Sequence, residues 1–288
     1  MKLRRYDGAQ AFIDGTFNVL LEREAQNNLM IANAQRGIGK DISGWFAASV
    51  DGEDGGVLLS ALAMPPYPML LYETRSTGGD EAIRMLAKEI AGIGYSIAGV
   101  LAQVETSKRF AAEYCAFTDQ TVSSAVSMNE MICTEAVAPH GVPGILRLLT
   151  VDDLFFAPFW ETEFSRECGI NVRELAGRFG AARRRVREAT QFIWEDQIPV
   201  SMAINGRKTP SGAVLNGVYT PPPYRRRGYA TACVSSLTQR LLGEGKQFCC
   251  LFADAANPVS NGVYNRIGYR NDCVLSEIHF KQIGSPNP

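Results

Sequence analysis

A short arginine-rich turn is the segment whose residue types point most directly to chemistry. It lies in the sequence GVYTPPPYRRRGYAT, residues 217–231, where a strand is expected to end at Thr220 and a helix to begin near Ala230. The first turn of a helix has unpaired N–H groups and the positive end of the helix dipole, and both favour phosphate. Gly228 lets the backbone approach an anion closely, and the arginines before it add charge-assisted hydrogen bonds. The turn is therefore a candidate polyphosphate site, and the alternative is a solvated basic turn that only starts a helix.

A second segment with a recognisable pattern follows the next expected strand. It reads LFADAANPVSNGVYNRIGY, residues 251–269. Asn257 is a favourable N-cap residue, Pro258 suits the first position of a helix, and Gly268 suits its end. The pattern predicts a short helix that carries Tyr264 near its C-terminus.

The two segments together resemble the GNAT superfamily of acyl-CoA N-acyltransferases. In that family a (Gln/Arg)-x-x-Gly-x-(Gly/Ala) motif follows the fourth strand, and an Asn-x6-Tyr-x3-Gly-(Phe/Tyr) segment lies further along the chain. The positions that match are Arg225, Gly228, Ala230, Asn257, Tyr264, Gly268 and Tyr269. The stretches EREAQNNLMIA, residues 22–32, and MPPYPMLLYE, residues 64–73, extend the resemblance to the N-terminal half of one bacterial subgroup.

The resemblance implies acetyl-CoA as cosubstrate and assigns a role to each matching position. The pantetheine arm pairs with the edge of the fourth strand, and backbone N–H groups of residues 226–231 hold the pyrophosphate. Tyr264 protonates the leaving thiolate as general acid; a buried aromatic residue without a catalytic role is the alternative. No metal site is expected. The implied cofactor-binding residues are Val218, Tyr219, Thr220, Arg225, Arg226, Arg227, Gly228, Tyr229, Ala230, Thr231 and Asn257.

The implied reaction is direct attack of a primary amine on the acyl thioester. An alkyl ammonium has a pKa near ~10, so a base must take its proton at neutral pH. The sequence leaves that base open, and each acidic side chain near the expected site also suits a surface carboxylate. The candidates are Glu161, Glu163, Glu195, Asp196 and Asp254.

The order of apolar segments predicts an α/β fold with a mixed (α+β) sheet in each of two similar halves. With the resemblance, this order implies a tandem GNAT-like architecture. The first half, residues 1–138, is expected to contain an early helix within residues 9–35. It shows no cofactor motif and is expected to be a degenerate GNAT-like domain. Its ends of strands and helices are set by Gly- and Pro-rich turns. The Pro/Gly-rich stretch at residues 138–144 predicts a linker, and residues 139–288 are expected to form the GNAT acyltransferase domain.

Composition narrows the classes of protein and partner. The net charge of -1 divides into 11 Lys and Arg against 17 Asp and Glu in residues 1–138, and 18 against 13 in residues 139–288. The basic half favours a compact anionic ligand over nucleic acid, and the acidic half favours a cationic amine or basic peptide as acceptor. Two histidines and seven cysteines without a CxxC pair disfavour a zinc site, a disulfide framework or a Ser/His/Asp hydrolase.

Two features bear on location and assembly. The chain has no apolar run long enough to cross a membrane and no apolar segment behind its basic N-terminus, so a cytoplasmic protein is expected. The oligomeric state is open, with a homodimer among the alternatives. The acceptor is a small-molecule amine or a peptide amine. A non-catalytic acyl-CoA-binding regulator or interaction protein is the alternative function, because the first half lacks a cofactor motif.

Overall fold

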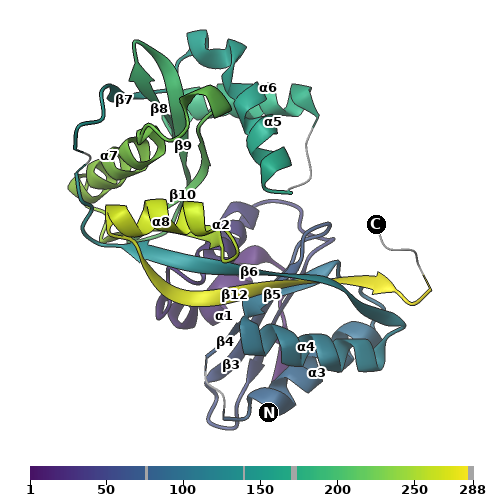
Figure 1. Cartoon of the computed structure of the whole chain (residues 1–288). Coiled ribbons are helices and arrows are strands. Elements are labelled where there is room, and N and C mark those ends of the chain that lie inside the picture. Colours follow the sequence, from purple (N-terminus) through teal and green to yellow (C-terminus); the bar gives the residue numbers. More distant parts are fainter. Residues whose placement is uncertain (75–76, 139, 170–173, 285–288) are drawn as a thin grey trace. The chain divides into compact units, whose positions relative to one another are not determined.

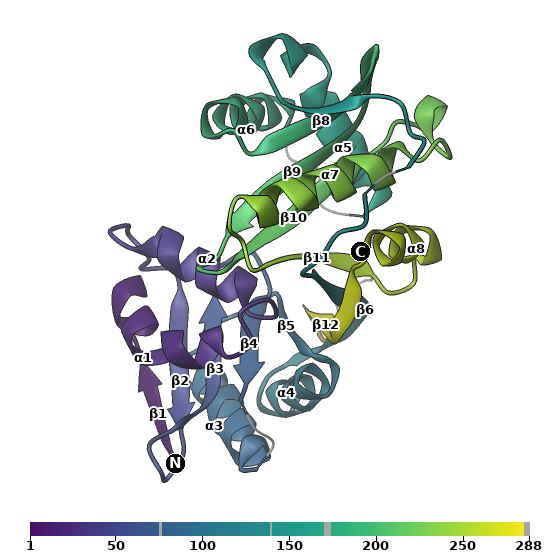
Figure 2. The same cartoon turned by 90° about the vertical axis from the view of Figure 1, so that its left-hand side faces the viewer.

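The computed structural model describes residues 1–74, 77–138, 140–169 and 174–284. Pro139 of the predicted linker lies outside the described residues. The described chain forms two compact units of mixed α/β structure, which confirms the predicted fold class (Figures 1 and 2). Unit 1 comprises residues 1–130, 254–256 and 272–288, and unit 2 comprises residues 131–253 and 257–271.

Unit 1 is built on a sheet with the strand order β1-β2-β3-β4-β5-β12-β6. Its helices form two pairs, since α1 packs against α2 and α3 packs against α4. The strands are β1 (Lys2–Arg5), β2 (Phe46–Asp51), β3 (Val57–Ala63), β4 (Met69–Glu73), β5 (Gly99–Gln103), β6 (Gln120–Cys133) and β12 (Arg270–Gln282). The helices are α1 (Ala9–Leu21), α2 (Asn28–Gly37), α3 (Gly79–Gly92) and α4 (Val104–Phe117).

The main core of unit 1 lies between the sheet and the pair α3 and α4. Side chains alternate along a strand, so Ala48 and Val50 of β2 share one face. They join the same buried cluster as Ile83 and Leu86 of α3 and Phe110 of α4. The amphipathic pattern of these helices follows from that single buried face.

Residues 9–35 are helical as expected, but they form two helices in place of one. The structure has α1 and α2 with a break at residues 22–27. Two buried asparagines stabilise the break, because the Asn27 side chain donates to the Leu20 carbonyl at 3.0 Å and the Asn28 side chain to the Ala25 carbonyl at 2.6 Å. Such side-chain bonds to backbone compete with continuous helix.

Unit 2 repeats the same plan with the strand order β11-β10-β9-β8-β7. Helices α7 and α8 pack against each other, and α5 packs against α6. The strands are β7 (Ile145–Leu148), β8 (Gln191–Asp196), β9 (Ile198–Lys208), β10 (Gly212–Tyr219) and β11 (Phe248–Asp254). The helices are η1 (Val151–Phe155), α5 (Ala157–Glu167), α6 (Leu175–Glu188), η2 (Pro222–Tyr224), α7 (Tyr229–Gly243) and α8 (Pro258–Ile267).

The compact units do not follow one cut of the chain. Residues 131–138 belong to unit 2, and residues 272–288 belong to unit 1, where β12 pairs antiparallel with β5 from Leu275 to His279. The sequence predicts one domain boundary between residues 138 and 139. That boundary concerns which segments can fold independently, and it stays a prediction.

Candidate functional site

The defining feature of unit 2 is that two parallel strands part after a few residues. β10 pairs with β11 only at Gly212–Phe248, Ala213–Cys249 and Val214–Cys250, although β10 continues to Tyr219. Within the described residues, the edge of β10 beyond Val214 therefore has no partner on the β11 side. Backbone N–H and C=O groups at such an edge are available to an extended ligand.

A bulge in β10 shapes this open edge. The pairing of β10 with β9 shifts register between Asn216 and Tyr219, so Gly217 and Val218 have no assigned partner on β9. Gly217 has φ +57°, and a Cβ there would come within 2.6 Å of the Ile204 Cδ1 atom. A side chain at this position would adopt a backbone angle that L residues rarely take, and Ile204 would have to move.

The three cofactor-binding residues predicted at the end of β10 differ in their backbone hydrogen bonds, and the resemblance assigns the arm to Val218 and Thr220. The Tyr219 carbonyl already accepts from the Ser201 hydroxyl at 3.2 Å, and the Thr220 carbonyl accepts from Arg225 Nε at 2.8 Å. Val218 is half-buried on the open edge, and within the described residues no strand partner is assigned to it. Val218 is therefore the best placed of the three for backbone pairing.

The arginine-rich turn leads from β10 into α7 as an exposed loop. Arg226 has φ +62° and Gly228 has φ +83°, and Gly228 is the N-cap residue of α7 without a side-chain cap. Residues 225–228 are exposed, and Val142 packs against Gly228, where a Cβ would lie 2.9 Å from Val142 Cγ2. The backbone N–H groups of the first turn, from Tyr229 to Thr231, have no intrahelical acceptor. They lie at the positive end of the helix dipole. This geometry fits the predicted anion site.

The three arginines of the turn have different surroundings. Arg225 Nη2 lies 2.6 and 2.8 Å from the two carboxylate oxygens of Glu167, and its guanidinium lies 5.7 Å from the Tyr219 ring centroid. Arg225 thus ties the turn to α5. Arg226 and Arg227 are exposed and form no ion pair within the described residues, and the Arg227 guanidinium also interacts with the Tyr229 side chain. The partner Glu167 was not predicted, because 58 positions separate it from Arg225.

Tyr229 joins the helix start to the β8–β9 hairpin. Its hydroxyl donates to Asp196 Oδ2 at 2.6 Å, and this hydrogen bond raises the pKa of Tyr229 above its ordinary value. The side chain is therefore structural, and a contribution of Tyr229 to anion binding is confined to its backbone amide. Ala230 and Thr231 are half-buried in the same first turn.

Tyr264 and Asn257 lie on α8, next to α7. The Asn257 side chain caps α8 by accepting from the Ser260 amide at 3.0 Å, as an N-cap residue does. Its Oδ1 is engaged, and its exposed Nδ2 can still donate. Tyr264 is 8% exposed and belongs to the same buried cluster as Tyr229, and its ring packs edge-on against Tyr269 at 5.9 Å.

The surroundings of Tyr264 favour the protonated phenol. Burial raises its pKa above the ordinary value near 10, and the charge of Cys168 raises it further, whereas a hydrogen bond with Ser260 lowers it. A group that holds its proton at neutral pH can act as an acid but not as a base.

The carboxylates considered as the base are all engaged. Glu195 lies 2.5 Å from Arg147 Nε, Glu163 lies 2.5 Å from Arg166 Nη1, and Asp196 accepts from Tyr229. The structure therefore selects none of these three as the base.

The two remaining carboxylates also have structural partners. The side chain of Glu161 is 3% exposed and forms ion pairs with Arg185 and Arg178 of α6, so it links α5 to α6. Asp254 Oδ1 accepts from the Ala256 amide at 2.8 Å.

One group of potential metal ligands occurs within the described residues, in unit 1. Single ligand atoms of Glu130, Asp272 and Cys273 lie within 4.8 Å of one another. Asp272 is already paired with Arg23 at 2.9 Å. Burial, with the charges of Glu130 and Asp272, raises the pKa of Cys273 to about 12, and a protonated thiol is a poor ligand. No helix of the described residues is long and apolar enough to span a bilayer.

Comparisons with known proteins agree with the plan of the two units. Residues 197–277 match the family model described as FR47-like protein. A GCN5-related N-acetyltransferase from Sphaerobacter thermophilus aligns with a TM-score of 0.66 at 15% identity, covering 100% of this chain and 96% of that one. An acetyltransferase of the GNAT family from Colwellia psychrerythraea aligns with a TM-score of 0.59 at 9% identity, covering 98% and 100%.

A tandem structure matches over the same length. A tandem GNAT protein from the clavulanic acid biosynthesis pathway aligns with a TM-score of 0.56 at 10% identity, covering 99% of both chains. No curated protein matches the chain. The chain therefore has the fold of the GNAT superfamily, as its two motifs indicate. It carries that fold twice, so the tandem architecture is confirmed.

The raised pKa of Tyr264 makes the stability of the protein depend on pH in a defined direction. Below about pH 9 both folded and unfolded chains hold this proton. Above about pH 10 the unfolded chain releases it and the folded chain retains it, so the stabilising contribution is lost as pH rises toward the folded pKa. We expect the free energy of unfolding to fall less between about pH 8 and pH 10.5 in Tyr264→Phe than in the wild type. Urea denaturation at the two pH values measures the free energy of unfolding of both proteins. An equal decrease in the two proteins would show that the pKa of Tyr264 is not raised.

Proposed function

We propose that unit 2 binds acetyl-CoA and transfers its acetyl group to a primary amine. The observation that carries the proposal is the parting of β10 from β11 directly before an exposed, uncapped helix start. An extended arm with amide groups suits the open edge, and a diphosphate suits the turn. The similarity to structures named as acetyltransferases supports the fold on which this site is built.

The residues of the site divide the chemical tasks. Backbone groups of Val218 orient the arm, and the amides of residues 229–231 with Arg226 and Arg227 hold the diphosphate. The amine attacks the thioester carbonyl, the C–S bond breaks, and the Tyr264 phenol gives its proton to the departing sulfur. The ammonium must lose a proton before it attacks, and this base is not assigned.

One observation favours a second candidate, a unit that binds acyl-CoA without catalysis. Every carboxylate considered as the base already has an ion pair or hydrogen bond in the structure. Binding of CoA without thiol release across a panel of alkyl amines, aminoglycosides, polyamines and peptide N-termini would favour this alternative. Thiol release with any of them would identify the acceptor class and favour the enzyme.

Acetyl-CoA binding tests the proposal directly. Isothermal titration of the wild type should show binding, and Arg226→Ala combined with Arg227→Ala should weaken it by about 10- to 100-fold, because each charged hydrogen bond is worth about 1.5–3 kcal/mol before compensation by water and counter-ions. The matched control is Arg183→Ala with Arg184→Ala, which removes two exposed charges from α6. Absence of binding by the wild type at millimolar ligand would refute the proposal.

Removal of the Tyr264 hydroxyl tests the general acid. Tyr264→Phe should lower turnover by on the order of 10² and leave the affinity for CoA nearly unchanged, because the proton is needed only as the C–S bond breaks. Thiol release with an accepted amine measures turnover, and titration measures affinity. Tyr269→Phe is the control, since it removes a neighbouring buried hydroxyl that bonds Thr238 at 2.8 Å. Unchanged turnover in Tyr264→Phe would remove the catalytic role.

A further inference from the structure

Unit 1 contains a helix start built like the one at Gly228. Helix α3 follows β4 and leads to β5, which pairs parallel with β4 at Met69–Val100 and Leu70–Leu101. Its N-cap residue, Gly78, has φ +81°, close to the +83° of Gly228. The first-turn amides of α3 therefore present the same positive end of a helix dipole.

A carboxylate of the chain itself lies against this helix start. Glu73 is the last residue of β4, and its side chain is 8% exposed. Its Oε2 atom accepts from the Thr106 hydroxyl at 2.6 Å and from Arg109 Nη2. A Cβ on Gly79 would collide with Glu73 Oε1, so this oxygen touches the first residue of α3. Within the described residues, Oε1 is buried without a hydrogen bond.

The groups around Glu73 form an anion site. A guanidinium, a hydroxyl donor and a helix N-terminus are the elements that proteins use to bind a phosphate or carboxylate. We call the space between Gly79, Thr106 and Arg109 the α3 anion site. We infer that Glu73 is an internal anion that fills the α3 anion site, and that the site is latent, able to take a free carboxylate once Glu73 is shortened.

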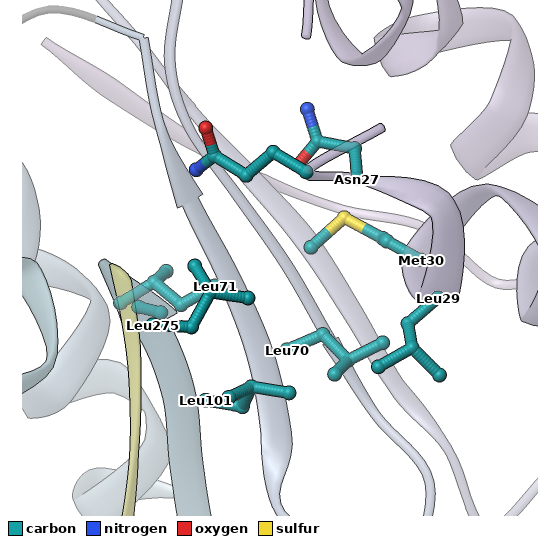
Figure 3. A pocket seen from close by; sticks show the side chains of 9 residues that line it. Asn27, Leu29, Met30, Leu70, Leu71, Leu101 and Leu275 are labelled. Atoms are coloured by element: carbon teal, nitrogen blue, oxygen red, sulfur yellow. The ribbon is translucent and has the colours of Figure 1, made fainter. Parts of the chain in front are cut away.

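One further observation explains why an external anion does not take this place: Arg109 also donates from Nη1 to Asp80 Oδ1 at 2.7 Å. The first turn of α3 carries Asp80 and Glu81, whereas the first turn of α7 has no acidic residue. A small pocket of unit 1, with a volume of about 20 Å³ and room for about one water, lies away from the α3 anion site. Figure 3 shows Leu29 and Met30 of α2 on one side of it and Leu70 and Leu101 of β4 and β5 on the other.

The consequence for stoichiometry rests on the proposed function. If unit 2 binds acetyl-CoA, we expect the chain to bind one molecule, because Glu73 already fills the corresponding helix start of unit 1. The occupancy of the α3 anion site is a separate claim, and its test does not involve CoA.

Chemical rescue by acetate tests the latent site. Acetate has the size of the group that Glu73→Ala removes. We expect Glu73→Ala to have a lower Tm than the wild type, and about 100 mM sodium acetate to raise its Tm by about 3 °C or more over sodium chloride of equal ionic strength. The wild type and Glu73→Gln should gain much less, because their own side chains still fill the site. The wild type also corrects for acetate bound at the Gly228 turn.

Glu105→Ala is the matched control, because it removes an exposed carboxylate from the first turn of α4, where Glu105 pairs with Lys108 at 2.9 Å. Its gain with acetate should equal that of the wild type. If Glu73→Ala is unfolded in chloride, circular dichroism with and without acetate replaces the melting curve, and acetate should restore the folded signal. Equal acetate effects on Glu73→Ala and the wild type, or no refolding by acetate, would overturn the inference.

Discussion

The backbone of β10 cannot pair with β11 beyond Val214, and the candidate site depends on this constraint. Hydrogen-bonding groups at a sheet edge need partners, and the parting of two parallel strands leaves them for a ligand. The register shift at Gly217 bends the edge, and the strand is followed by nine residues that lead to the uncapped start of α7. One local departure from regular sheet thus places two features in sequence. The strand edge can pair with the amide groups of a ligand, and the helix start can bind its phosphates.

Much of this site could be predicted from the sequence because its signals are local. Gly228, Asn257 and Gly268 each mark a helix end, and the structure places helix termini at all three. Their backbone angles and caps depend on residues a few positions away, which a motif records. The same holds for the strands before the two motifs. The roles of Tyr264 and of the residues around Gly228 in binding and catalysis stay predictions.

The remaining features come from long-range pairing, which no local pattern encodes. Arg225 was predicted as an anion ligand, yet the structure pairs it with Glu167 on α5. Residues 272–282 have the pattern of a strand, but nothing in that pattern shows that they pair with β5 of unit 1. The contact of Glu73 with α3 was equally hidden. It relies on Arg109, which lies 36 positions away, and on the missing Cβ of Gly79.

Hydrogen–deuterium exchange with and without acetyl-CoA is the most direct measurement of the central claim, since it reports on backbone amides themselves. Ligand pairing with the open edge and the helix start should slow exchange in peptides that cover residues 215–220 and 226–231, and leave residues 77–82 of unit 1 unchanged. Unchanged exchange over residues 215–231 at saturating acetyl-CoA would contradict the account, as would protection that appears at residues 77–82 instead.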